Sequence, residues 1–102
     1  MKNASSWDNG SPDYKTGAGL GLRIDSNYQS SIFNQKLNTI IIYHNNNLVA
    51  QNVNVSNKIC QKLIDKNIGL WLIHNNWHLW LTGHPHRFTI TRVGYTNRFD
   101  IV

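Results

Sequence analysis

The sequence of 102 residues contains one cysteine, Cys60, and no glutamate. A single cysteine excludes an internal disulfide bond and any cysteine-based zinc cluster. The five aspartates are the only acidic side chains. The paired carboxylates of glycosidases and the carboxylate sets of two-metal nucleases are therefore difficult to assemble from this chain.

Long apolar stretches are also missing. No run approaches the roughly 18 apolar residues that cross a bilayer. The start of the chain has no apolar segment of the kind found in signal peptides. We therefore read no secretory signal and expect a cytoplasmic protein without a membrane partner.

Acidic charge is scarce in the later part of the chain. Up to residue 26 three cations balance three aspartates, whereas from residue 27 onward seven cations face only Asp65 and Asp100. The net charge of +5 therefore comes entirely from the later part. Such asymmetry favours polyanionic partners, and the alternative explanation is solubility alone.

The length fits a single domain over residues 1–102. Turn-forming residues within 1–18 indicate an irregular leader. Apolar residues alternate over 20–25, which predicts a strand, and Gly19 and Gly21 indicate a close neighbouring backbone or a bulge. A further short strand is expected within 28–33.

Two β-hairpins are predicted further along the chain. Residues 39–44 and 48–55 are rich in β-branched side chains, and three asparagines at 45–47 separate them. Asparagine tolerates the backbone of tight turns, so this pattern is typical of a hairpin. Residues 87–92 and 98–102 are expected to form the second hairpin.

One principal helix is predicted over residues 56–68. Ser56 is a suitable N-cap, and Gly69 is a suitable end. Residues 70–81 are compatible with helix or strand, although 77–81 alternates as a strand does. The apolar side chains that recur at helical spacing and are expected to pack on the sheet are Ile59, Cys60, Leu63 and Ile64.

These elements predict an α+β fold with about five mostly antiparallel strands. Two hairpins and an N-terminal strand form the sheet, and the helix near 56–68 covers it. The residues expected in the core are Leu20, Leu22, Ile24, Ile41, Val49, Val53, Leu70, Phe88, Ile90, Phe99 and Ile101.

Four of the five histidines lie within 13 residues. Four imidazoles are enough for a tetrahedral metal shell, but no carboxylate lies nearby in sequence to orient the rings. We therefore interpret them as surface or half-buried residues and expect neither a metal nor a cofactor. These histidines are His74, His78, His84 and His86.

Lysines recur every four residues along the predicted helix. Like charges at this spacing repel each other, and opposing phosphates would relieve the repulsion. The first hypothesis is therefore a small, basic, non-catalytic domain that binds nucleic acid or another polyanion; a solvated helix face is the alternative. The residues expected to contact phosphates are Lys58, Lys62, Lys66, Arg87, Arg92 and Arg98.

The second hypothesis is an inhibitor or adaptor that docks on the acidic surface of a larger protein. Tryptophan, tyrosine and arginine concentrate at protein interfaces. The candidate anchors are Trp77, Trp80 and Tyr95. The sequence leaves the oligomeric state of the chain open.

A third hypothesis is a metal-independent ribonuclease. Histidine titrates near neutral pH and is a suitable general base, and arginine stabilises a charged phosphate. His84 or His86 would act as the base, with Arg87 or Arg92 at the phosphate.

Overall fold

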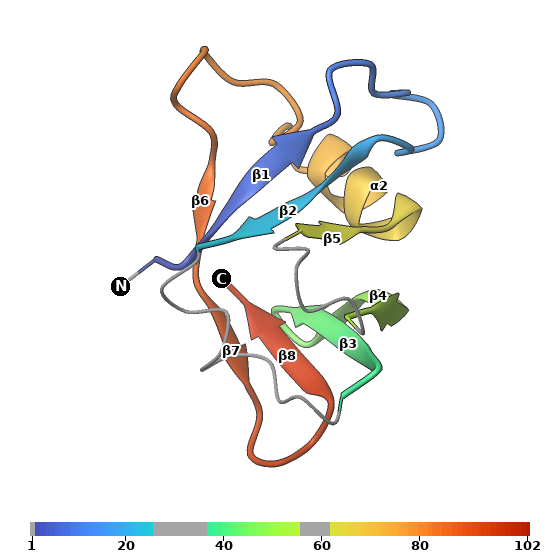
Figure 1. Ribbon diagram of the computed structural model, residues 1–102, viewed down its shortest axis with the longest axis vertical. Coiled ribbons are helices and arrows are strands. Elements are labelled where there is room, and N and C mark those ends of the chain that lie inside the picture. Colours follow the sequence, from blue (N-terminus) through green and yellow to red (C-terminus); the bar gives the residue numbers. More distant parts are fainter. Residues whose placement is uncertain (1, 26–36, 56–61) are drawn as a thin grey trace.

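The computed structural model describes residues 2–25, 37–55 and 62–102. The strand expected within 28–33 lies outside these ranges, as do Lys58, Ile59 and Cys60 of the predicted helix. The described residues form an α+β arrangement, which agrees with the expected fold class. They contain two four-stranded sheets and one helix, so eight strands replace the five expected (Figure 1).

The first sheet has the strand order β5-β2-β1-β6. Strand β2 (Leu20–Ile24) confirms the predicted N-terminal strand. It pairs antiparallel with β1 (Ala4–Asp8) on one side and with β5 (Lys62–Ile64) on the other. Strand β6 (Arg87–Phe88) pairs with the free side of β1 and completes the sheet.

The prediction of an irregular leader over 1–18 is wrong at 4–8, which form strand β1, whereas residues 9–18 are irregular and contain turns as expected. Strand β1 lies between β2 and β6, inside the first sheet. Ala4, Ser5 and Ser6 of this strand are buried. Alanine and serine have little preference for strands, so β1 could not be predicted from local sequence. Pairing with a strand on each side stabilises it instead.

The second sheet has the strand order β4-β3-β8-β7. Strand β3 (Thr39–His44) and strand β4 (Asn47–Asn54) form the first predicted hairpin. Strand β7 (Ile90–Arg92) and strand β8 (Arg98–Ile101) form the second. The two hairpins join through β3 and β8, which run parallel.

The turn of the first hairpin consists of Asn45 and Asn46. Their φ angles are 52° and 64°, and His44 pairs directly with Asn47 across the turn. A two-residue turn of type I′ requires positive φ at both central positions, and asparagine tolerates this better than most residues. The local sequence therefore determines this turn.

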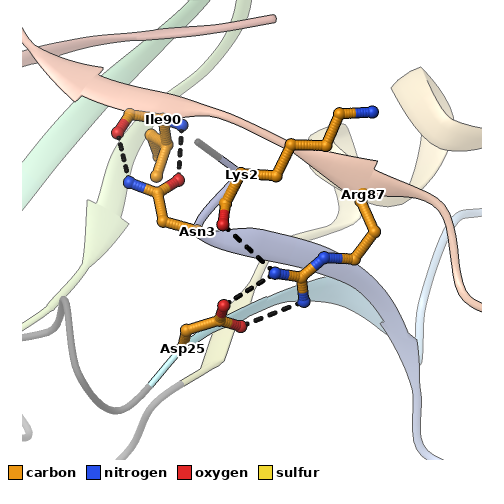
Figure 2. Close-up of polar contacts among 5 residues, drawn as sticks. All are labelled: Lys2, Asn3, Asp25, Arg87 and Ile90. Carbon is orange, nitrogen blue, oxygen red and sulfur yellow. Dashed lines mark hydrogen bonds and ion pairs between the residues drawn. The ribbon is translucent and has the colours of Figure 1, made fainter.

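The two sheets are linked where β6 continues into β7. Between these strands, Thr89 exchanges backbone hydrogen bonds of 3.0 and 2.9 Å with Val102. Beside this point the buried Asn3 side chain donates to the Ile90 carbonyl at 3.0 Å and accepts from the Ile90 N–H at 2.8 Å (Figure 2). The amide thus replaces a neighbouring strand and attaches the N-terminal segment to the second sheet.

Helix α2 spans Lys66–His74. The prediction of a helix over 56–68 is therefore wrong at residues 62–64, which form β5, and the helix ends at residue 74 rather than at 68. The N-cap is Asp65, whose carboxylate accepts the Asn67 N–H at 2.7 Å. Leu63 is buried in β5 and the following Ile64 is 53% exposed. This is the alternation of a strand, and its pairing partner β2 is too distant in sequence for local periodicity to indicate.

Gly69 lies inside α2 rather than at its end because another backbone packs on it. A Cβ atom at Gly69 would collide with the Gly17 carbonyl, and Gly17 itself has a φ of 80°. In β2, a Cβ atom at Gly21 would likewise collide with the Leu63 carbonyl. This is the close backbone approach that the glycine indicated.

Most of the expected core is buried. Ile41, Val49 and Leu70 are only half-buried, whereas Ile40 and Ile42 of β3 are fully buried. The prediction of Ile41 as a core residue is therefore wrong by one position. Adjacent residues of a strand lie on opposite faces, and the face that carries Ile40 and Ile42 is the buried one. The predicted core residues that are buried are Leu20, Leu22, Ile24, Val53, Phe88, Ile90, Phe99 and Ile101.

The alternating segment 77–81 does not form a strand. It belongs to an irregular connection from α2 to β6, which projects beyond the sheets (Figure 1). Within the described ranges, no helix combines the length and apolar character needed to cross a membrane.

Candidate functional site

A groove of about 550 Å³ lies between helix α2 and the β3–β4 hairpin. Its lining contains amides, imidazoles and apolar side chains but no carboxylate, lysine or arginine. The hairpin contributes His44, Asn45, Asn47, Leu48 and Val49, and the helix with its C-cap contributes Asn67, Leu70, Trp71, His74 and Asn75.

An aromatic cluster holds Trp71 in the wall of the groove. Its ring centroid lies 5.3 Å from that of His44, 5.2 Å from Trp77 and 5.4 Å from Phe88. His44 and Trp77 are also in contact, at 5.8 Å. Edge-to-face packing of this kind is favourable for aromatic pairs. Trp71 is therefore fixed by its neighbours while remaining only half-buried.

Hydrogen bonds to the backbone orient two of the groove asparagines. Asn75 follows α2, and its Nδ2 donates to the Trp71 carbonyl at 2.8 Å. In the hairpin, Asn47 Nδ2 donates to the Asn45 carbonyl at 3.3 Å. Because an amide carries its oxygen acceptor at a fixed angle from the nitrogen, these contacts also orient the oxygens.

Two of the predicted cations are adjacent to groove residues: Lys66 precedes Asn67 in sequence, and Arg98 contacts the hairpin turn. The pKa of Asp13 is lowered by a hydrogen bond from the Lys15 backbone and, to a smaller extent, by the charge of Lys66. Lys66 is exposed in the first turn of α2. Arg98 donates to the Asn46 side-chain oxygen in the hairpin turn at 3.4 Å. Its guanidinium lies 4.0 Å from the centroid of the Tyr43 ring and donates to Asp100 at 2.9 Å. Arg98 is thus held beside the hairpin by three groups.

Arg87 makes its hydrogen bonds within the protein. It donates to both carboxylate oxygens of Asp25, at 3.1 and 2.7 Å, and to the Lys2 carbonyl at 3.2 Å (Figure 2). The hydrogen bond from Arg87 lowers the pKa of Asp25, and the same bond raises the pKa of Arg87. This arginine connects β6 to the end of β2.

Arg92 and Lys62 also have partners in the fold. Arg92 donates to the carbonyls of Thr96 and Tyr95 at 2.7 and 3.1 Å, which stabilises the β7–β8 turn. The Lys62 ammonium lies 4.7 Å from the centroid of the Trp7 ring, from its place in β5. Because Lys62 is in a strand, it does not share a helix face with Lys66. The predicted lysine stripe is therefore wrong for these two residues.

The predicted aromatic anchors do not form one surface. Trp77 is packed in the aromatic cluster, and Trp80 is half-buried in the projecting connection. Tyr95 is 98% exposed in the β7–β8 turn, which lies at the opposite end of the long axis (Figure 1). The sequence did not single out Leu79 and Leu81 beside Trp80, which are 61% and 78% exposed.

The clustered histidines lie in separate environments. His74 lines the groove, whereas His78 packs edge-on against Tyr14, with ring centroids 5.1 Å apart. Among residues 2–25, 37–55 and 62–102, no group of three or more histidine, cysteine or acidic side chains is placed to hold a metal ion.

The residues of the ribonuclease hypothesis are largely engaged elsewhere. His86 Nε2 lies 3.1 Å from the Leu79 carbonyl, and His84 is exposed. Arg87 and Arg92 have the internal acceptors described above. Neither guanidinium is therefore available to a phosphate without losing these hydrogen bonds.

The groove itself was not predicted. The asparagines at 45–47 were interpreted only as a turn, and Asn67 and Asn75 lie on a helix whose bounds were different. One signal was present, because asparagine is unusually abundant and lies near tryptophan and histidine in the segment 67–78. In comparisons with known proteins, no family model, curated protein or solved structure matches the chain, so the function must be argued from this groove.

Proposed function

We propose that this protein is a non-catalytic domain that binds nucleic acid through the groove between α2 and the β3–β4 hairpin. The observation that carries the proposal is the composition of the groove. It presents an indole, two imidazoles and four amides without a carboxylate. Lys66 directly precedes the groove residue Asn67 in α2, and Arg98 contacts the hairpin turn.

Charge and chemistry support this assignment together. A net charge of +5 attracts a polyanion over a distance. Phosphates would contact the cations beside the groove, while indole and imidazole rings stack on bases and amides pair with base edges.

Fluorescence anisotropy with a labelled oligonucleotide tests the proposal. Replacing Lys66 with glutamine (Lys66→Gln) removes a charge beside the groove and should weaken binding by about 1 kcal/mol, or about fivefold. The matched control is Lys2→Gln, an exposed lysine on the N-terminal segment away from the groove. The proposal fails if the wild-type protein does not bind at low salt, or if both variants weaken binding equally.

A second candidate function rests on the projecting connection. Leu79 and Leu81 are exposed beside Trp80, and no charged residue lies between 75 and 86. Exposed apolar side chains in a charge-free segment are typical of a protein interface. The partner would be an acidic protein, which the basic remainder of this chain attracts.

Affinity capture after nuclease treatment tests this second candidate. A partner retained by the wild-type protein should be lost with the double variant Leu79→Ser, Leu81→Ser. Retention by the double variant, or loss of the partner on nuclease treatment alone, would exclude a role for these leucines in protein docking.

A further inference from the structure

We propose that the groove accepts single-stranded nucleic acid by its unpaired bases and discriminates against duplex. This inference rests on the proposed function and names its ligand class. It follows from where the charged and the neutral groups lie around the groove.

The groove lining suits a base better than a phosphate. No lysine or arginine lines it, so a phosphate inside would be desolvated without a counterion. Lys66 comes from α2, one wall of the groove, and Arg98 reaches from β8 to Asn46 in the turn of the hairpin that forms the other wall. A strand whose phosphates contact these two residues places the intervening base or bases against the lining.

The amides favour bases whose edges are not already paired. Asparagine offers a donor and an acceptor side by side, which matches the hydrogen-bonding edges of nucleobases. In a duplex the Watson–Crick edges are occupied by the opposite strand, whereas in a single strand they are open. Four asparagines line the groove, two from the hairpin and two from the helix with its C-cap.

Trp71, in the wall of the groove, also favours a single strand over a duplex. Trp71 is half-buried and is held by ring contacts, so its exposed part is presented without loss of side-chain freedom. Stacking of a base on such a ring is available to a single strand, in which bases can rotate out. Bases stacked within a duplex do not reach it.

The position of α2 disfavours the usual mode of duplex binding. The helix packs against β2 and β4 (Figure 1). Its groove-facing residues form one wall of the groove. A recognition helix that enters the major groove must instead project from the protein surface. Ile68, Gly69 and Leu72 of α2 are buried, so the helix does not project freely from the surface.

The test compares three ligands of equal length by fluorescence anisotropy at one low salt concentration. The ligands are a mixed-sequence single strand, the same sequence in a blunt duplex, and a single-stranded backbone of abasic sites. The single strand should bind at least about tenfold more tightly than either of the others. Intrinsic Trp fluorescence should change only with the single strand that carries bases.

Matched substitutions test whether the groove residues are the ones that bind the bases. Asn67→Ala and His74→Ala remove polar groups from the groove and should weaken binding of the single strand by about fivefold each, with abasic binding unchanged. The controls are Gln51→Ala on β4 and His84→Ala in the projecting connection, both exposed and outside the groove lining. Thermal melts should show that all four variants remain folded.

The outcomes separate the inference from the function on which it rests. Equal affinity for all three ligands, or tighter binding of the duplex, overturns the inference while the protein remains a nucleic-acid binder. Absence of binding to every ligand overturns both. If the controls weaken binding as much as the groove variants, the bases are bound elsewhere and the inference is wrong.

Discussion

The Asn3 side chain connects the N-terminal segment to the second sheet through two hydrogen bonds to Ile90. Replacement by alanine (Asn3→Ala) would leave a buried N–H and a buried carbonyl unpaired. The free energy of unfolding should fall by about 2–3 kcal/mol. Urea denaturation measures the change, and Asn38→Ala, at an exposed position before β3, is the matched control.

An equal effect of the two substitutions would show that the Asn3 amide contributes no more than an exposed asparagine does. The same result would show that the hydrogen bonds from Asn3 to Ile90 do not attach the N-terminal segment to the second sheet.

The ion pair between Asp25 and Arg87 makes stability depend on pH. Because hydrogen bonding to Arg87 lowers the pKa of Asp25 in the folded protein, its contribution is present above the unfolded pKa of about 3.9. It is lost as the pH falls through the lowered folded pKa. Asp25→Asn should therefore destabilise the protein more at pH 6 than at pH 2.

The expected effect at pH 6 is small, about 1 kcal/mol at most, because both side chains remain partly exposed to water. Urea denaturation at the two pH values measures it. In an Arg87→Gln background, Asp25→Asn should have no further effect at pH 6, and an undiminished effect would contradict the assignment to this pair.

At the scale of the elements, the contact between Gly17 and Gly69 determines where α2 packs. Alanine is the better helix former by about 1 kcal/mol, so propensity alone predicts that Gly69→Ala stabilises the protein. The collision of its Cβ with the Gly17 carbonyl reverses the sign. We expect a loss of about 1–3 kcal/mol in urea denaturation.

The control for Gly69→Ala is Asn67→Ala, at an exposed position of the same helix, which should change stability by less than about 0.5 kcal/mol. A gain of stability with Gly69→Ala would show that the loop of Gly17 can move away from α2.

The elements that could be predicted are those with a local cause. The first hairpin has alternating β-branched residues around an asparagine turn, and the strand at 20–25 alternates clearly. The helix was misplaced at 62–64 because Leu63 and Ile64 continue a helical apolar spacing in the sequence, and only the pairing of β5 with β2 selects the strand. The groove could not be predicted, because its two walls come from elements far apart in sequence.

At the scale of the whole molecule, the distribution of cations determines the salt dependence of binding. If all six predicted cations contacted phosphates of a single strand, the logarithm of the affinity would fall with the logarithm of salt concentration with a slope of about −4. Among the described residues, Arg87 and Arg92 donate to internal acceptors and Lys62 contacts the Trp7 ring. Lys66 precedes the groove residue Asn67, and Arg98, which donates to Asp100 through Nε, contacts the hairpin turn. We count these two cations as the phosphate contacts of the groove.

We therefore expect a slope of about −1.4, measured by anisotropy titrations of a single-stranded oligonucleotide at several salt concentrations. A slope near −4 would indicate that phosphates contact the cations of both sheets, and the groove would then not be the main binding surface.

The sequence by itself determined the α+β class, the two hairpins, the strand at 20–25 and the excess of positive charge. Alternation, turn chemistry and composition act over a few residues, so they can be read locally. Tertiary structure alone decided that β1 lies inside a sheet, that β5 is a strand and that Arg87, Arg92 and Arg98 bind internal acceptors. It also brought Trp71 and four asparagines together, because each of these outcomes depends on a partner distant in sequence.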